Sequence, residues 1–315
     1  MMSFDKDKLI LVKALMALLI VADHLNFFLD LGWLKPFKEL GAPIVSVFFF
    51  ISGFGLVRSW QNKGQQYLKD FIRSKFLRIV LPALLALAAY YLLLWNPRRD
   101  YLLDWKNLAL YGTPILPFSW FAEAIVFFYL VYYLSFRYLK GKWKSAGILA
   151  GTLLWMAVTI LIGYDWCWWI CSLSFPSGAF FARYEKDIYA FCEAKPYRYY
   201  ALLGGLDVLF LALYMPRNPY LWTLCYILIP AIVALVIAKL PLGRLRGPVL
   251  LFISGISYEI YLCHGIPMEL LRDRLPIQNP LLFILAVYAL TLLLAFAVQR
   301  LSRFISTKLC ASSTT

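Results

Sequence analysis

Ten segments of the sequence are long and apolar enough to cross a lipid bilayer as helices, which leaves no stretch for a soluble domain of ordinary size. They cover residues 8–31, 40–60, 71–96, 117–139, 145–163, 164–182, 199–216, 219–239, 248–272 and 279–303. Apolar residues make up 62% of the chain and charged residues only 15%, which excludes a soluble enzyme, a disordered chain and a small disulfide-bonded scaffold. We therefore expect an all-α polytopic membrane protein with about ten transmembrane helices. We expect a single domain over residues 1–305, followed by a short, polar, disordered tail over 306–315.

The distribution of positive charge predicts the orientation of these spans. Of the 31 Lys and Arg residues, 23 lie on the side of the membrane that holds the N-terminus and 8 on the other. Because cytoplasmic loops collect Lys and Arg, both termini are expected in the cytoplasm. The net charge of +14 is explained by this topology, so we expect no nucleic-acid partner. Trp166, Trp168 and Trp169 then fall at the outer interface, where tryptophan is enriched.

Two cysteines are spaced like a pair of metal ligands. Cys167 and Cys171 are one helical turn apart, but neither has a His or a second Cys pair nearby. Burial as packing residues is the favoured interpretation, and no metal site is expected.

The chain has only two histidines, and both are expected at one depth in the membrane. His24 and His264 each lie 16 residues beyond the start of a span that runs outward, and Glu123 lies six residues into a span that enters from outside. A lone His in an apolar helix is more often a packing residue, and that alternative stays open. Ionisable groups inside a membrane are nevertheless functional candidates by default, and this set has the side chains of a general acid–base site.

The first span places a cation and an imidazole on one face. Lys13 and His24 are eleven helical steps apart, which is about three helical turns and roughly 16 Å along the axis. The alternative is that Lys13 extends to the inner interface. Asp23 points about 100° away from His24 around the helix, so an orienting partner must come from another span, with Glu123 and Glu259 as candidates.

Two further patterns suggest binding surfaces. Arg73, Lys75 and Arg78 form a cytoplasmic basic cluster, which suits the phosphates of a cofactor and suits equally a topology determinant or a lipid-headgroup contact. Ser257 and Tyr261 recur with His264 at i, i+4 and i+7 on an otherwise apolar helix, which predicts a wall that faces a cavity.

Taken together, these residues resemble acyltransferase family 3, a family of integral membrane acyltransferases that modify extracytoplasmic glycans and related acceptors. The matching segments follow in order across about residues 10–270, and they are Lys13-x10-His24, Phe48-Phe-Phe-Ile-Ser-Gly-Phe54, Lys75-Phe-Leu-Arg78 with Pro82, Trp120-Phe-Ala-Glu123 with Tyr129, Ser174-Phe-Pro-Ser-Gly178 and Ile256-Ser-Tyr-Glu-Ile-Tyr-Leu-Cys-His264. Lys75 stands where the family has Arg, which keeps the charge and loses bidentate geometry.

The resemblance implies a donor, an acceptor and a role for each candidate residue. The donor would be acyl-CoA, with acetyl the favoured acyl group, and its phosphates would be held by Arg73, Lys75 and Arg78, with Lys13 assisting. His24 would be the general base on a hydroxyl of a cell-surface glycan or lipid-linked glycan, with Glu123 or His264 orienting it or stabilising charge. Ser257, Tyr261 and Trp120 would line the acceptor cavity. The implied location is a bacterial plasma (inner) membrane, with membrane lipids as partners and no metal cofactor.

Two other classes of function share some of these features. A transporter or flippase with a proton-relaying His pair would have the same intramembrane polar stripe but no need for the basic cluster. A sensor or scaffold would tolerate replacement of His24. The sequence indicates no oligomeric state.

The charge bias makes a testable prediction about topology. A cysteine introduced after Asp165 should react with a membrane-impermeant thiol reagent from outside the cell, and one introduced near Lys142 should not. The reverse labelling pattern would remove the basis for a donor that binds from the cytoplasm.

Overall fold

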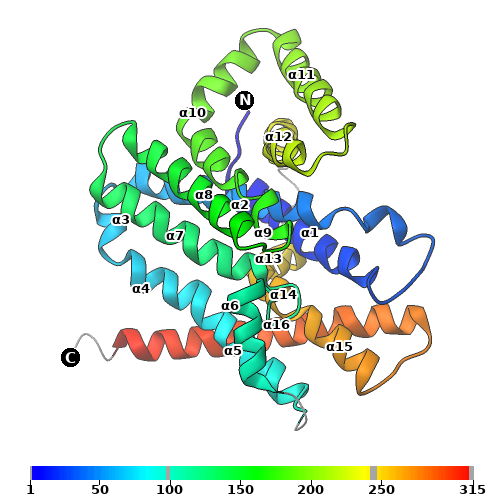
Figure 1. Cartoon of the computed structure of the whole chain (residues 1–315). Coiled ribbons are helices and arrows are strands. Elements are labelled where there is room, and N and C mark those ends of the chain that lie inside the picture. The colour runs from blue at the N-terminus through cyan, green and yellow to red at the C-terminus, as the bar shows by residue number, and fades with distance from the viewer. Residues whose placement is uncertain (1, 97–99, 242–246, 312–315) are drawn as a thin grey trace. The chain divides into compact units, whose positions relative to one another are not determined.

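The computed structural model describes residues 2–96, 100–241 and 247–311, and within these ranges the chain forms helices without any strand (Figure 1). In chain order the elements are α1 (Lys6–Leu25), η1 (Lys35–Phe37), α2 (Gly41–Lys63), α3 (Gln66–Lys69), α4 (Phe71–Lys75), η2 (Phe76–Val80), α5 (Leu81–Leu93), α6 (Tyr101–Tyr111), α7 (Trp120–Tyr138), α8 (Trp143–Leu161), α9 (Cys167–Ile170), α10 (Ser174–Ala194), α11 (Pro196–Tyr214), α12 (Pro219–Lys239), α13 (Pro248–Gly255), α14 (Ser257–Cys263), α15 (Gly265–Asp273) and α16 (Pro280–Ala311). Four of the charges counted for the topology, Arg98, Arg99, Arg244 and Arg246, lie outside the described residues.

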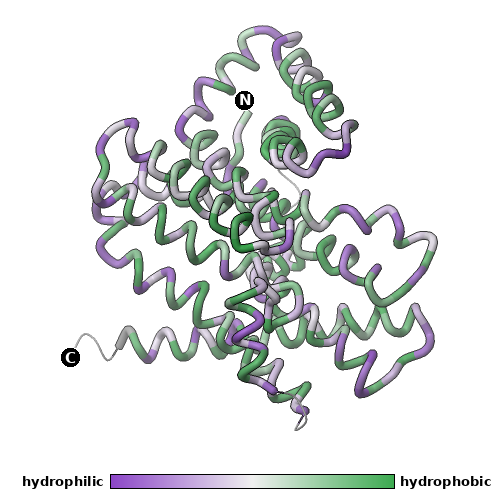
Figure 2. The backbone as a smooth tube through the Cα atoms, viewed as in Figure 1, coloured by the Kyte–Doolittle hydropathy of each residue, from purple (hydrophilic) through white to green (hydrophobic). Residues whose placement is uncertain are grey.

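Six helical segments within the described ranges are long and apolar enough to cross a membrane. They are Gly41–Lys63, Phe71–Leu93, Trp120–Tyr138, Trp143–Leu161, Pro219–Lys239 and Pro280–Leu309. A seventh crossing is formed if α13 and the stretch Ser257–Asp273, which meet at a bend of 56°, count as one broken span. Figure 2 shows green, hydrophobic stretches along these helices and purple, hydrophilic residues in many of the turns. The protein is therefore all-helical, with the composition of a multi-pass membrane protein.

Two of the other three predicted spans fall on helices that carry charged residues. The span expected over 8–31 lies on α1, which carries Lys8, Lys13 and Asp23, and the span expected over 199–216 lies on α11, which carries Arg198 and Asp207. The count of about ten spans and the cytoplasmic termini therefore stay predictions.

Several boundaries differ from those expected. The segment 164–182 is not one helix, because α9 ends at Ile170 and α10 runs from Ser174 to Ala194. Residues 306–311 are helical rather than a disordered tail, because α16 continues to Ala311. The short helix α6 was not expected. Its 11 residues are too few to span, but Asp100 caps its first turn and Gly112, with a φ of 64°, ends it.

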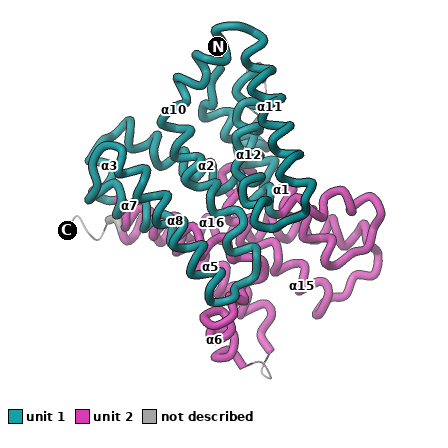
Figure 3. The backbone as a smooth tube through the Cα atoms, turned by 45° about the horizontal axis from the view of Figure 1, so that its top comes forward, with its two compact units in different colours: residues 1–16, 42–70, 127–251 teal, residues 17–41, 71–126, 252–315 magenta. Residues whose placement is uncertain are grey.

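The chain divides into two compact units, which Figure 3 shows in teal and magenta. The first contains residues 1–16, 42–70 and 127–251, and the second contains residues 17–41, 71–126 and 252–315.

In the first unit, α2 and α10 approach until their backbones touch at two glycines. A Cβ atom at Gly53 would overlap the carbonyl oxygen of Phe175, and one at Gly178 would overlap the carbonyl oxygen of Phe50. Small residues at such crossings allow the close packing that holds helices together where the hydrophobic effect is absent. Gly53 belongs to the segment Phe48–Phe54 singled out in the sequence, and α2 is continuous through it.

In the second unit, two spans are distorted by identifiable causes. The five residues of η2 form a π-helical turn just before Pro82, because proline lacks an N–H and its ring clashes with the preceding turn. The break between α13 and α14 falls at Ile256, and the side chain of Gln299 on α16 donates to the freed carbonyl of Gly255. The hydroxyl of Tyr258 donates to the Ile79 carbonyl within η2 at 3.1 Å.

Replacing Gly53 with Ala should destabilise the protein, because the added methyl group meets the Phe175 backbone, which cannot move aside. Overpacking of this kind costs about 1–3 kcal/mol of the free energy of unfolding. The matched control is Gly55→Ala on the same helix, where nothing lies within 4 Å of the new Cβ. Thermal unfolding of the two purified variants measures the difference, and equal melting temperatures would contradict the close approach.

Candidate functional site

The two histidines of the chain lie against each other in the second unit. Nδ1 of His24 on α1 is 2.6 Å from Nε2 of His264, although 240 residues separate them in the sequence. The two rings are nearly parallel, with centroids 4.8 Å apart and planes 10° apart. His24 is 9% exposed and His264 is fully buried. Two titratable groups in direct contact and out of water form the obvious candidate for acid–base chemistry.

The second nitrogen of His264 faces the backbone of its own helix. Nδ1 is 2.7 Å from the Tyr261 carbonyl oxygen and 3.3 Å from the Ile260 carbonyl oxygen. Both neighbours are hydrogen-bond acceptors only, so the ring is held at its Nδ1 side by α14 and presents Nε2 to His24.

Phe118 covers the pair from the turn that precedes α7. Its ring stacks on His24 with centroids 4.0 Å apart and planes 10° apart, and its centroid is 5.6 Å from that of His264. Its φ of 64° is a conformation that residues other than glycine rarely adopt. The hydroxyl of Tyr261 donates to the Phe118 carbonyl and accepts from the backbone N–H of Phe121, which holds this turn in place.

Gly265 makes room for that turn directly after His264. A Cβ atom there would lie 2.7 Å from Cβ of Pro117 and 3.3 Å from the Phe118 ring. The contact is too tight for any larger residue unless the turn moves away, so this glycine fixes how closely Phe118 covers the imidazoles.

Asp23 lies closer to His24 than the helical spacing predicts. Its Oδ2 is 3.6 Å from Nε2 of His24, which is an ion-pair distance only if the imidazole is protonated and is too long for a hydrogen bond. Its Oδ1 accepts the backbone N–H of Gly41, the first residue of α2, at 2.9 Å. The expectation that Asp23 points away from His24 is therefore wrong, because the hydrogen bond to Gly41 holds the carboxylate near the ring.

The predicted glutamates do not contact the pair. Oε1 of Glu123 accepts from the Ser119 hydroxyl at 3.2 Å, and its Oε2 is buried with no hydrogen-bond partner among the described residues. Glu259 is buried on α14 and interacts electrostatically with Arg303. The residue that contacts His24 from another helix is His264, one of the two partners expected from the resemblance.

The basic cluster lies on α4 and η2, also in the second unit. Arg73 is exposed and donates to the Leu309 carbonyl near the end of α16 at 2.8 Å, and the Lys75 ammonium lies 5.5 Å from the Phe71 ring centroid. Arg78 is exposed within the π-helical turn. π-Helical turns are frequent at functional sites, so Arg78 is the member of the cluster best placed for a ligand.

The remaining predicted residues lie on three different helices. Lys13 is half-buried on α1 and belongs to the first unit, so its part in donor binding remains a prediction. Ser257 is buried at the start of α14, and Trp120 is half-buried at the start of α7.

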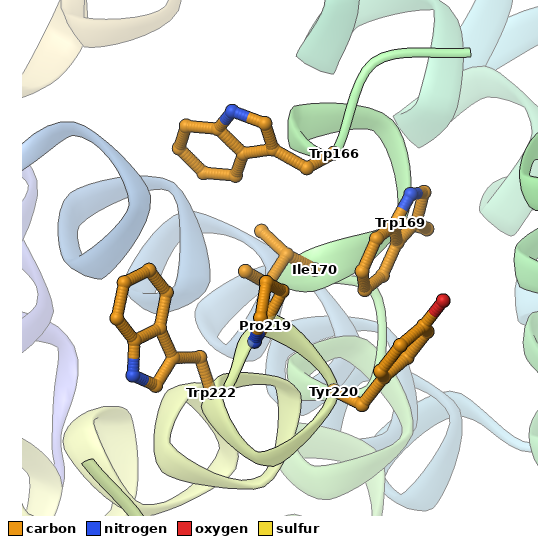
Figure 4. Close-up of a pocket in the computed structure, with 6 residues that line it drawn as sticks. All are labelled: Trp166, Trp169, Ile170, Pro219, Tyr220 and Trp222. Carbon is orange, nitrogen blue, oxygen red and sulfur yellow. The ribbon is translucent and has the colours of Figure 1, made fainter. Parts of the chain in front are cut away.

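A separate aromatic pocket lies in the first unit. Its volume is about 320 Å³, and Trp166, Trp169, Tyr220 and Trp222 surround Ile170 and Pro219 (Figure 4). Indole and phenol groups suit an apolar or interfacial contact better than proton transfer. Two of the tryptophans expected at the outer interface, Trp166 and Trp169, thus line this pocket, and their depth in the membrane stays a prediction.

No metal centre competes with the imidazole pair in the part of the chain that the structure describes, since no group of three or more His, Cys, Asp or Glu could hold an ion. Cys171 is buried, with its Sγ 3.2 Å from the Ala42 carbonyl oxygen.

The residues that sequence reasoning missed are Phe118, Ser119 and Gly265. The first two fall inside the span expected over 117–139, but α7 begins only at Trp120, so they lie in the turn that precedes the helix. Gly265 follows His264 directly, and this adjacency is the only signal that could have singled it out.

A comparison with protein families matches the chain to the acyltransferase domain of acyltransferase family 3 over residues 6–300. Searches of curated proteins and of solved structures gave no match.

Asp23 should stabilise the fold through its bond to Gly41. Asp23→Ala removes a carboxylate that accepts a backbone N–H at the start of α2, which is expected to cost about 1–2 kcal/mol of the free energy of unfolding. Asp23→Asn keeps an acceptor oxygen and should cost less. The control is Asp30→Ala, because Asp30 is exposed and its ion pair with Lys35 is a surface one. If the Asp23→Ala and Asp30→Ala variants melt at the same temperature, the hydrogen bond between Asp23 and Gly41 does not stabilise the fold.

Proposed function

The chain belongs to acyltransferase family 3, and on this premise we propose that it moves an acyl group from acyl-CoA to a hydroxyl of an extracytoplasmic acceptor. Membrane acyltransferase activity in general follows from the family. We propose further that the acyl group is acetyl and that the acceptor is a cell-surface glycan or a lipid-linked glycan. The proposed location is a bacterial plasma (inner) membrane, with its lipids around the spans.

The observation that carries the proposal is the His24–His264 contact. An acyl transfer to an alcohol needs a base, because a hydroxyl is a weak nucleophile until its proton is removed. A neutral imidazole is the side chain best suited to accept that proton near neutral pH. The buried pair supplies one imidazole for the proton and a second that holds the first in place.

We propose that His24 is the general base. It takes the proton of the acceptor hydroxyl while the oxygen attacks the carbonyl carbon of the thioester. The carbon–sulfur bond then breaks, and the thiolate leaves with the proton that His24 returns. The products are the O-acylated acceptor and free CoA, so no atom or proton remains on the enzyme.

The basic cluster supports a donor that binds from the cytoplasm. Charge-assisted hydrogen bonds from guanidinium groups are the usual way in which proteins hold phosphates. Arg73 already donates to α16, so in the proposal Arg78 makes the main phosphate contact, with Arg73, Lys75 and Lys13 assisting.

Glu123 is proposed to contact the acceptor. A buried carboxylate oxygen without a hydrogen bond is costly in the free protein. A hydroxyl group of a bound sugar would satisfy it, with Trp120 on the same turn of α7 and Ser257 as further lining residues.

A transporter or flippase with a His proton relay is the alternative that shares the buried pair. The two functions differ in one simple observation. Purified acyltransferase releases free thiol from acyl-CoA when an acceptor is present, and a transporter releases none.

Replacing His24 with Ala should lower the rate of acyl transfer by about 10²–10⁴-fold, because the step then lacks its base. The measurement is the transfer rate of purified protein, with acyl-CoA binding determined in parallel. Transfer at the wild-type rate would rule out His24 as the base. Loss of donor binding and of folding together would show that His24 is structural.

The matched variant for this measurement is Arg78→Ala, which leaves both imidazoles in place. A lost charge-assisted contact should weaken acyl-CoA binding by roughly ten- to a hundred-fold with little change in the rate at saturating donor. If Arg78→Ala binds acyl-CoA as well as the wild type does, the cluster serves topology or lipid contact instead.

A further inference from the structure

The hydrogen bonds around the histidine pair have a definite direction. Nδ1 of His264 faces the carbonyl oxygens of Tyr261 and Ile260, at 2.7 and 3.3 Å. A nitrogen lone pair at that distance would be repelled by the oxygen lone pairs, so Nδ1 must carry the hydrogen. In a neutral ring the other nitrogen, Nε2, is then an acceptor.

That acceptor fixes the tautomer of the neighbouring ring. Nε2 of His264 lies 2.6 Å from Nδ1 of His24, and two lone pairs cannot face each other so closely. Nδ1 of His24 therefore carries a hydrogen and donates it to His264, which leaves the lone pair of His24 on Nε2. Resting on the proposed function, we infer that His264 is a positioning residue that makes Nε2 of His24 the atom that receives the acceptor proton.

The surroundings of Nε2 agree with this role. It is the nitrogen on the far side of the ring from His264, and the described contacts give it no hydrogen bond. Oδ2 of Asp23 lies 3.6 Å away, so its carboxyl group is close enough to stabilise, in its ionised form, the imidazolium that forms when Nε2 takes a proton. The stacked ring of Phe118 keeps the imidazole plane fixed.

If the hydrogen bond between the two rings ran from His264 to His24, the buried His264 ring would have to be positively charged. If His24 carried its hydrogen on Nε2, its Nδ1 lone pair would need a donor, and His264 would have to hold hydrogens on both nitrogens. His264 is fully buried, and a buried imidazolium without a contacting carboxylate costs several kcal/mol. A series of hydrogen bonds between neutral groups, from His24 to His264 and from His264 to the α14 backbone, has no such cost.

The histidine content makes this direction measurable without any substitution. Because the chain has only two histidines, ¹⁵N-histidine labelling of the full chain, purified without a polyhistidine tag into lipid nanodiscs, gives spectra of these two rings alone. The expected result is two neutral imidazoles, both protonated at Nδ1. A His24→Gln sample assigns the remaining signal to His264. Protonation of His24 at Nε2, or an imidazolium signal from His264, would overturn the inference.

A pair of variants tests the positioning role by its effect on transfer. His264→Gln keeps an oxygen acceptor at about the position of Nε2, whereas His264→Leu leaves the Nδ1 hydrogen of His24 unpartnered. We expect His264→Leu to lower kcat by about 10- to 100-fold, with the KM for acyl-CoA unchanged, and His264→Gln to restore much of that loss. Equal loss in both variants would overturn positioning through this bond.

The spectra and the kinetics test the positioning role of His264 and the proposed function separately. If the protein transfers no acyl group, the proposed function fails while the tautomers can still be as inferred. If transfer depends on His24 but the spectra show protonation at Nε2, the proposed function stands and the role of His264 does not.

Discussion

The hydrogen bond between His24 and His264 is the contact on which the candidate site depends. Burial removes His264 from water, so both of its nitrogens must find a partner within the protein. The α14 backbone takes the hydrogen of His264, and His264 takes the hydrogen of His24. This series of hydrogen bonds leaves one imidazole lone pair, and in the proposed function it makes one ring the base and the other its support.

The elements around the pair have features that follow from holding it. Helix α14 starts after a break, with the freed Gly255 carbonyl satisfied by Gln299. The turn before α7 places Phe118 over His24 at an unfavourable φ, and Tyr261 fixes it there. Strained backbone and broken helices are tolerated inside a membrane only where the surrounding protein satisfies them. Here the strained turn at Phe118 lies against His24, and the break at Ile256 precedes the helix that ends at His264.

How much the sequence predicted varies with the kind of feature. Apolar segments with few charges, such as 219–239 and 279–303, were placed well because length and composition decide whether a helix can span. The sequence could also single out both histidines, since rare ionisable groups stand out in an apolar chain. It could not show that they touch, because 240 residues separate them and only tertiary packing brings them together. The same holds for Phe118, and for Asp23, whose carboxylate is turned by a contact with Gly41 that no helical wheel contains.

A double-mutant cycle on the transfer rate tests the pairing most directly, with His24→Ala, His264→Ala and the double variant compared with the wild type. Residues that act as one unit have non-additive effects. If His264 acts only through His24, the double variant should transfer about as slowly as His24→Ala alone. If the two losses multiply, the histidines act independently and the account of the site is wrong.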